Sequence, residues 1–306
     1  MIVDREGEKE MTMQTEVKEL HAPGHRACPG CGCAIAVKSI LRETGPNTIV
    51  VSPTGCLETF TSPIRGSSWE VPWIHSLFEN APAIATGVLA GLNAKGNPDG
   101  TKVVVIGGDG GTYDIGMGSL SGMFERKDDI LYICYDNEAY MNTGIQGSSA
   151  TPLGVGTTTT PVTGNSFGKT VEKKDLVAIA LAHGVPYVAT ASIANLADLK
   201  KKVRKGMDNP GPAFILMLTP CNVGWGYEPE ETVELARKAV ETGLFPIVEF
   251  EDGDLVSALK IRPVPVEEYL KPQKRYQHLF KNEKFTDVLE AIRKKAEDNI
   301  KKFDLV

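Results

Sequence analysis

The chain has no long apolar run, few aromatic residues and no concentration of basic side chains. None of its apolar segments reaches the roughly 18 residues of a membrane-spanning helix, so no membrane span is expected. Lysine and arginine are scattered or mixed with glutamate, and the net charge is −6, which argues against a nucleic-acid-binding surface. No basic start followed by an apolar core is found, so we expect no export signal. With 42% hydrophobic and 24% charged residues, the composition is typical of a globular protein rather than a disordered or fibrous one.

From about residue 30 onward, short apolar segments alternate with helical patterns. Strands are predicted over 48–52, 102–106, 130–135, 187–190 and 213–218, and helices over 33–44, 79–93, 117–125, 175–182 and 196–207. This alternation predicts an α/β fold, a doubly wound parallel sheet with helices on both faces. Ligands of such sheets bind beyond the carboxyl ends of the strands.

Three regions are expected along the chain: a polar arm over 1–20, the α/β domain over 21–245 and a small appendage over 246–306. The appendage reads as a hairpin over 247–259 and an amphipathic helix over 283–303, and its expected role is subunit contact. Inside the domain, residues 142–169 are dominated by Gly, Ser, Thr and Pro. A loop of this length inside a compact domain is usually functional.

A glycine-rich motif follows the predicted strand at 102–106. It reads Gly107-Gly108-Asp109-Gly110-Gly111, and the next strand ends in Asp136-Asn137. Adjacent parallel strands would bring Asp109 and Asn137 to the same edge, where hard oxygen ligands and a diphosphate suit Mg²⁺. A dinucleotide fingerprint lacks its third glycine here, and a P-loop lacks its Gly-Lys-Ser/Thr. Strand, Gly-Asp-Gly, strand and Asn in this order resemble the motif that binds thiamine diphosphate.

Six cysteines in a chain without an export signal favour reduced thiols, a metal site or catalysis over disulfides. Cys28 and Cys31 form a Cys-x-x-Cys turn, and Cys56 and Cys221 each follow a predicted strand. Cys134 lies inside an apolar strand and reads as a core thiol. Four convergent thiolates could bind zinc or an iron-sulfur cluster, and a thioredoxin-like redox pair remains an alternative for the Cys-x-x-Cys turn. The thiamine motif beside them favours iron, because a cofactor that makes electron-rich carbanions suits a one-electron acceptor.

These motifs together resemble the beta subunits of 2-oxoacid:ferredoxin oxidoreductases, most closely the pyruvate:ferredoxin oxidoreductase (pyruvate synthase) branch. The resemblance covers roughly residues 20–245. The matching segments include Cys28-Pro29-Gly30-Cys31-Gly32, Thr54-Gly55-Cys56-Leu57-Glu58, Pro72-Trp73-Ile74-His75, Gly108-Asp109-Gly110-Gly111-Thr112, Asp136-Asn137-Glu138-Ala139-Tyr140-Met141-Asn142-Thr143-Gly144 and Pro220-Cys221.

The resemblance implies a role for each matched position. Cys28, Cys31, Cys56 and Cys221 would bind a [4Fe-4S] cluster, and Asp109, Asn137 and the Ala139 carbonyl would bind Mg²⁺. Thiamine diphosphate would contact Gly108, Gly110, Gly111, Asn137, Ala139, Tyr140, Asn142 and Thr143, with further contacts at Cys56 and Cys33. Asn142 would lie near the reactive carbon of the cofactor and is the candidate catalytic residue. Cys33 stands where some relatives carry Glu, so its alternatives are a cluster ligand or a packing residue at a helix N-terminus.

The implied reaction is the reversible oxidative decarboxylation of pyruvate to acetyl-CoA and CO₂, with electrons passing through the cluster to ferredoxin. The implied partners are an alpha subunit with the pyrimidine-binding domain, a gamma subunit and a ferredoxin-like delta subunit, in the cytoplasm of an anaerobe. Coenzyme A would be the co-substrate. One alternative is the same chemistry on 2-oxoisovalerate, 2-oxoglutarate, phenylglyoxylate or oxalate. Another is a zinc-stabilised assembly subunit without catalysis.

Two further polar residues lie among aromatic side chains before the glycine motif. His75 and Glu79 are candidate acid-base groups, but Trp69, Trp73 and Phe78 surround them in the sequence, which favours a hydrogen-bonded structural role. Glu79 precedes the diphosphate motif in the same domain and is not expected to reach the aminopyrimidine ring. We therefore expect the catalytic carboxylate to come from a partner subunit.

Overall fold

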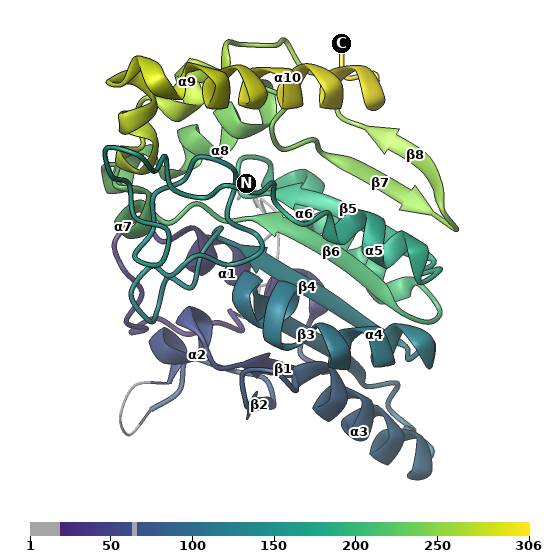
Figure 1. Ribbon diagram of the computed structural model, residues 1–306. Helices are drawn as coiled ribbons and strands as arrows, with labels where there is room; N and C mark the ends of the chain where they lie inside the picture. The colour runs from purple at the N-terminus through teal and green to yellow at the C-terminus, as the bar shows by residue number, and fades with distance from the viewer. Residues whose placement is uncertain (1–18, 63–65) are drawn as a thin grey trace, which may run out of the picture.

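The computed structural model describes residues 19–62 and 66–306, and a single mixed sheet runs through them (Figure 1). Within these residues the sheet has eight strands in the order β2-β1-β3-β4-β6-β5-β7-β8. The strands are β1 (Thr48–Pro53), β2 (Trp73–Ser76), β3 (Lys102–Gly108), β4 (Ile130–Asp136), β5 (Tyr187–Ser192), β6 (Ala213–Leu218), β7 (Val248–Glu251) and β8 (Asp254–Ala258). The first six are parallel, and β7 and β8 are antiparallel to their neighbours. The predicted α/β class is thus confirmed.

Helices cover both faces of the sheet (Figure 1). They are α1 (Gly32–Thr44), α2 (Cys56–Thr61), α3 (Ala81–Ala94), α4 (Met117–Glu125), α5 (Leu176–Ala182), α6 (Leu196–Asp208), α7 (Asn222–Trp225), α8 (Thr232–Glu241), α9 (Val266–Leu270) and α10 (Thr286–Lys302). Short turns of other helical types are η1 (Gly110–Ile115), η2 (Pro229–Glu231), η3 (Lys274–Phe280) and η4 (Glu283–Phe285). Helices α3, α4, α5 and α10 pack on one core, and α1, α2 and α6 pack on the other. In the described part of the chain no helix is both long and apolar enough to cross a membrane.

The central strands are buried over their whole length, as expected for a parallel sheet between two helical layers. Every residue of β4 and β6 is buried, and β3 is buried except at its two ends. Strands β3 and β4 are direct neighbours, with Gly108 opposite Tyr135. This register brings the residues that follow both strands to one edge of the sheet and builds the site there.

The C-terminal segment continues the fold rather than standing apart from it. The hairpin predicted after residue 246 is present, and its first strand, β7, pairs with β5 in the main sheet. Helix α10 then crosses the top of the molecule in Figure 1, near the hairpin. The division between residues 245 and 246 stays a prediction, but the sheet runs across it.

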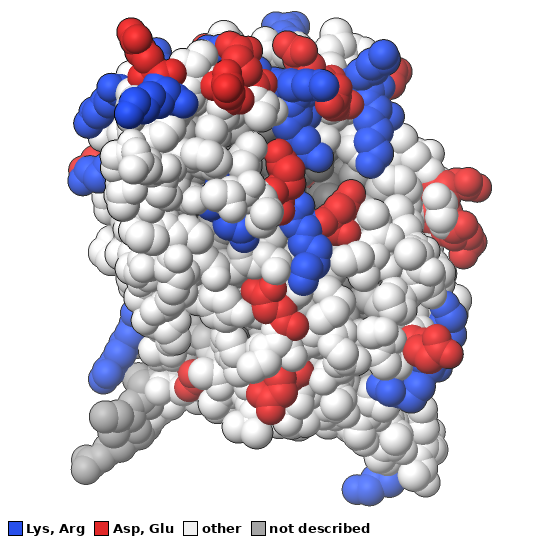
Figure 2. All heavy atoms as spheres, viewed as in Figure 1, with Lys and Arg blue, Asp and Glu red and all other residues white. Residues whose placement is uncertain are grey.

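The long loop predicted after β4 is also present. No helix or strand lies between Asp136 and Leu176 in the described chain, apart from isolated bridges such as Tyr140 to Gln146. Over residues 142–168 the sequence contains no Asp, Glu, Lys or Arg. In Figure 2 charged side chains gather along the upper part of the face, while the left side, where Figure 1 draws this loop, is almost free of them.

Candidate functional site

Three oxygen-bearing groups converge where β3 and β4 end. One terminal atom of the Asn137 amide lies 2.8 Å from the Ala139 carbonyl oxygen and 3.0 Å from Asp109 Oδ1. The Asn137 amide has two possible orientations. With its nitrogen at this position it donates a hydrogen bond to each of the two oxygens, and with its oxygen at this position it forms a set of three oxygens with Asp109 and Ala139. Neighbouring ligands in an octahedral Mg²⁺ shell stand about 3.0 Å apart, because each lies roughly 2.1 Å from the ion. The three groups therefore fit the hard-cation site predicted from the sequence.

The electrostatic surroundings of Asp109 also favour a bound cation. Its carboxylate is 1% exposed and accepts a hydrogen bond of 2.6 Å from the Ser148 hydroxyl. Burial, and after it the neighbouring Asp136 carboxylate, raises the pKa of Asp109 well above its usual range. No Lys or Arg of the described residues forms an ion pair with Asp109, although nearby carboxylates are paired. A divalent cation would supply the missing positive charge.

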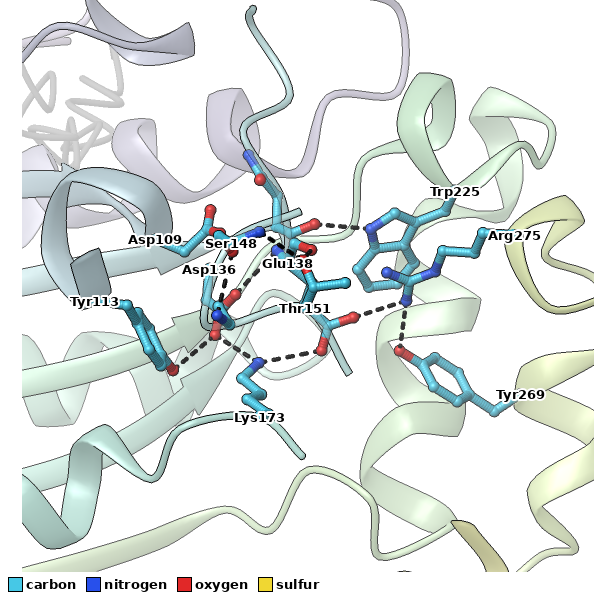
Figure 3. Close-up of polar contacts among 12 residues, drawn as sticks. Asp109, Tyr113, Asp136, Glu138, Ser148, Thr151, Lys173, Trp225, Tyr269 and Arg275 are labelled. Carbon is cyan, nitrogen blue, oxygen red and sulfur yellow. Dashed lines mark hydrogen bonds and ion pairs between the residues drawn. The ribbon is translucent and has the colours of Figure 1, made fainter. Parts of the chain in front are cut away.

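The residues on either side of Asn137 belong to a buried charge network (Figure 3). Lys173 Nζ lies 2.6 Å from Asp136 Oδ2 and 3.1 Å from Glu138 Oε1. Arg275 Nη2 lies 2.7 Å from the other carboxylate oxygen of Glu138. Burial raises the pKa of Glu138, but Lys173 and Arg275 outweigh it and hold that pKa below its usual value. Two carboxylates and two cations thus balance, and both carboxylates point away from the cation cradle.

A cleft of about 180 Å³ opens beside the cradle and holds most of the predicted cofactor residues. Its lining includes Cys56, Gly108, Asp109, Gly110, Gly111, Asn137, Ala139, Tyr140, Asn142 and Thr143, together with Thr54, Gly55, Phe78, Tyr135 and Met141. Gly110 begins the π-helical turn η1, and a Cβ there would lie 2.3 Å from the Tyr140 ring. A side chain at position 110 would therefore clash with the Tyr140 ring, which favours glycine here.

The residues after Ala139 form the rim of this cleft. Tyr140 is half-buried and its hydroxyl donates to Asp114 at 3.0 Å, while the exposed Asn142 amide donates to Thr59 Oγ1 at 3.2 Å. The Thr143 hydroxyl is also exposed and donates to Gln146 at 2.6 Å. The predicted catalytic role of Asn142 stays a prediction, and its exposed position leaves the amide accessible to a ligand.

The four predicted cluster cysteines gather at one side of the same edge. The turn that carries Cys28 and Cys31 packs on the segment around Cys221, since a Cβ on Gly32 would lie 2.7 Å from the Pro220 carbonyl oxygen. Cys28 is exposed, whereas Cys31, Cys56 and Cys221 are half-buried. None of the six cysteines forms a disulfide.

The thiols influence one another electrostatically. Burial, followed by Cys221, Cys31 and Cys28, raises the pKa of Cys56 to about 12. Burial raises the pKa of Cys221 to about 11, and Cys31 and Cys28 contribute to the rise. Deprotonating several of these thiols together would therefore need a positive centre between them, as a metal cluster supplies.

The four predicted cluster cysteines do not form a site for a single metal ion in this structure. In residues 19–62 and 66–306, no three His, Cys, Asp or Glu side chains are close enough to hold one metal ion. A [4Fe-4S] cubane is larger than a single ion, so its ligands need not be so close.

The remaining two cysteines lie in the interior. Cys33, at the start of α1, is 4% exposed and packs in the core on the α1 side of the sheet. It still influences Tyr135, whose pKa is raised first by burial and then by Cys33. Its cofactor role stays a prediction, and its burial matches the packing role that the sequence left open. Cys134 is fully buried in β4, as predicted for a core thiol.

Of the two candidate acid-base residues before the motif, His75 has side-chain partners, whereas Glu79 is placed only by its backbone. His75 Nε2 lies 2.8 Å from Thr54 Oγ1, and the His75 ring stacks on Trp73. The backbone beside Glu79 lies against the glycine turn, because a Cβ on Gly116 would lie 3.2 Å from the Glu79 carbonyl oxygen. These contacts support the hydrogen-bonded role of His75 expected from the sequence.

Three residues of the site were not predicted. Trp225 Nε1 donates a 2.8 Å hydrogen bond to the Asn137 carbonyl, and Lys173 and Arg275 balance the charges beside it. Trp225 follows Cys221 by only four residues, which could have drawn attention to it. Arg275 lies in the appendage, where the sequence offers no comparable signal.

Comparison with known proteins agrees with this geometry. Residues 53–217 match the model of the thiamine pyrophosphate enzyme, C-terminal TPP binding domain. Pyruvate synthase subunit PorB of Methanosarcina barkeri is 52% identical over 293 residues, which cover 95% of this chain and 99% of that protein. PorB of Methanocaldococcus jannaschii is 51% identical, covering 88% of this chain and 93% of its own.

A subunit named for another substrate has a lower sequence identity to this chain than the PorB subunits do. Ketoisovalerate oxidoreductase subunit VorB of Pyrococcus abyssi is 43% identical and covers 85% of this chain and 86% of its own. Among solved structures, 2-oxoglutarate:ferredoxin oxidoreductase from Magnetococcus marinus, with 2-oxoglutarate, coenzyme A and succinyl-CoA bound, has a TM-score of 0.57 at 23% identity. That match covers 72% of this chain and 78% of that chain, and at this identity it shows the shared fold.

Proposed function

The chain belongs to the thiamine pyrophosphate enzymes and, among them, to the pyruvate synthase PorB family, and on this premise we propose that it binds thiamine diphosphate for the oxidation of pyruvate to acetyl-CoA and CO₂. The observation that carries the proposal is the convergence of the Asp109, Asn137 and Ala139 oxygens beside a glycine-lined cleft. When bound, thiamine diphosphate accepts the electron pair released in decarboxylation, and a [4Fe-4S] cluster accepts single electrons.

The protein's own contribution is positioning and charge. Asp109, Asn137 and the Ala139 carbonyl hold Mg²⁺, and this ion neutralises the diphosphate. Gly108, Gly110 and Gly111 let the backbone approach the diphosphate, and Tyr140 and Thr143 line the cleft. Asn142 presents its amide to the substrate at the rim. Cys28, Cys31, Cys56 and Cys221 hold the cluster beside the same cleft.

The active enzyme contains further subunits. The described chain has one mixed sheet with one glycine-aspartate motif, so an alpha subunit supplies the pyrimidine-binding domain and its catalytic carboxylate. Gamma and ferredoxin-like delta subunits complete the complex, coenzyme A is the co-substrate, ferredoxin takes the electrons, and the complex works in the cytoplasm. Residues 142–168 support this proposal, because their exposed parts, 142–144 and 158–165 in the main, carry no charged side chains and suit a subunit interface better than open solvent.

Two measurements test the proposal. The assembled enzyme, purified without oxygen, is assayed with a panel of 2-oxoacids, coenzyme A and a viologen dye. Pyruvate should give the highest kcat/KM, and a higher value for 2-oxoisovalerate would assign the chain to the VorB-like activity instead. The chain should also show a broad absorption band near the violet-blue boundary that dithionite bleaches. A colourless protein with stoichiometric zinc would contradict the cluster assignment.

A further inference from the structure

One side chain joins the cluster segment to the cation cradle. Helix α7 begins immediately after Cys221, and its last residue, Trp225, is fully buried. The Trp225 indole N–H donates to the main-chain carbonyl of Asn137, the residue whose side chain enters the cradle. A contact 88 residues apart in sequence thus holds the backbone of a cation ligand.

Arg275 holds the Trp225 ring in place from the other side (Figure 3). The guanidinium carbon lies 3.7 Å from the centre of the indole ring, and the group is 6% exposed. Its nitrogens donate to Glu138 at 2.7 Å and to Gln273 at 2.8 Å, which fixes the plane of the guanidinium over the ring. Tyr269 packs edge-on against the same ring. Trp225 is therefore enclosed by the C-terminal segment and has little freedom to move.

The turn that Trp225 holds needs such support. Glu138 adopts a positive φ of 69°, a conformation that is costly for a residue with a side chain. The Glu138 amide donates to Asp136 at 3.0 Å, and its carbonyl accepts from Thr151 at 2.7 Å. These contacts fix the turn on the Glu138 side, and the indole fixes the Asn137 carbonyl.

We infer that Trp225 is a positioning residue for the cation site, and that Arg275 acts through it. Together they fix the main chain of Asn137. The side-chain amide oxygen of Asn137 then faces Asp109 and the Ala139 carbonyl. This rests on the proposed function, since it requires a divalent cation at that cradle. Outer contacts that orient metal ligands typically change metal affinity by roughly 10- to 100-fold. Because Cys221 directly precedes α7, the cluster segment and the cation turn are held as one unit.

The test uses Trp225→Phe in the assembled enzyme, which keeps an aromatic ring but removes the indole N–H. Mn²⁺ replaces Mg²⁺. The enzyme is titrated with Mn²⁺ in the presence of thiamine diphosphate, and the electron paramagnetic resonance signal of free Mn²⁺ is followed. We expect Mn²⁺ to bind about 10-fold more weakly, with an altered signal from the bound ion. High Mn²⁺ should restore cofactor binding, a rescue that general destabilisation would not allow.

Trp73→Phe is the matched control. Trp73 also donates its indole N–H, to Ser52 at 2.7 Å, and stacks on aromatic rings without touching the cradle. This variant should bind Mn²⁺ like the wild type. Arg275→Lys keeps the positive charge beside Glu138 but loses the flat stacking group, and should weaken Mn²⁺ binding in the same direction. The double variant Trp225→Phe/Arg275→Lys should then be little weaker than either single variant.

The outcomes distinguish a failure of the inference about Trp225 from a failure of the cation site itself. If wild-type enzyme binds Mn²⁺ with thiamine diphosphate and Trp225→Phe binds it equally well, the inference is overturned while the proposed function stands. If the wild type does not bind Mn²⁺ with the cofactor, the cation site itself is wrong and the inference fails with it. Should Trp225→Phe not assemble, Arg275→Lys decides, and unchanged Mn²⁺ affinity in that variant also overturns the inference.

Discussion

Replacing Lys173 by methionine removes the ammonium group that Asp136 and Glu138 share. Glu138 would keep its partner Arg275, whereas Asp136, which is fully buried, would keep only the Tyr113 hydroxyl and a backbone amide. One uncompensated buried charge costs about 3–5 kcal/mol. We expect the free energy of unfolding to fall by about that amount near neutral pH.

The loss should depend on pH in a defined direction. Burial already raises the pKa of Asp136, and Lys173 is the neighbour that most opposes this rise. Without Lys173 the folded-state pKa rises further above that of the unfolded chain, so the folded protein binds more protons. Stability of the variant relative to the wild type therefore falls as the pH rises, and the penalty should be larger at pH 8 than at pH 5.

Thermal and denaturant unfolding of the purified chain at these two pH values provide the measurement. A loss of this size lowers the apparent midpoint by roughly 5–8 °C for a chain of this length. Lys201→Met is the matched control, because Lys201 is exposed on α6 and forms no ion pair within the described part of the chain. It should change the unfolding free energy by about 0.5 kcal/mol or less.

A second substitution identifies the charge responsible. Asp136→Asn combined with Lys173→Met removes the uncompensated charge, so the double variant should recover a large part of the lost stability. If Lys173→Met costs no more than Lys201→Met, or if its cost does not change between pH 5 and pH 8, the buried network does not act as described.

Three further outcomes are expected. Asp109→Ala should weaken Mg²⁺-dependent binding of thiamine diphosphate by more than about 100-fold, as a calorimetric titration would show, because even outer contacts of a metal site change affinity by 10- to 100-fold. Cys221→Ser should remove most of the cluster iron, whereas Cys134→Ser should retain it; iron analysis that gave the reverse order would refute the ligand set. Burial, then the neighbouring His25, lowers the pKa of His21 from 6.5 to about 4, so the unfolded chain binds more protons between these pH values. The free energy of unfolding should then fall as the pH drops through that window, and His21→Gln should flatten the dependence.

The meeting of Asp109 and Asn137 at one edge of the sheet could be predicted, because local sequence rules determine where these two residues lie. A buried strand followed by Gly108-Asp109-Gly110 and a second buried strand followed by Asn137 place both side chains at one sheet edge. The cysteine turns could be predicted for the same reason, since Cys56 and Cys221 come directly after strands. For residues that directly follow strands of a parallel sheet, the sequence pattern is enough to predict the sheet edge at which they lie.

Other parts of the fold gave weak or no signals. Strand β2 has four residues and is partly exposed, so its apolar pattern is short. Helix α8, by contrast, buries Leu235, Ala236, Ala239 and Val240 on one regular face, so its pattern was recognisable although no helix was predicted there. The contact of Arg275 with Glu138 joins residues 137 positions apart and follows no periodic pattern. Such contacts depend on the packed three-dimensional structure, so the sequence alone predicts no role for the appendage in the site.

The distance along the chain between Glu138 and Arg275 has a consequence during synthesis. Ribosomes add about 5–20 residues per second, so Arg275 is made roughly 7–27 s after Glu138. Until then the nascent domain carries the Glu138 carboxylate without one of its two cations, and Trp225 without the group that stacks on it. The cofactor-binding edge can therefore reach its final order only when translation is nearly finished. A nascent chain released early would contain all the residues that match the thiamine family model but would lack the segment that holds their turn in place.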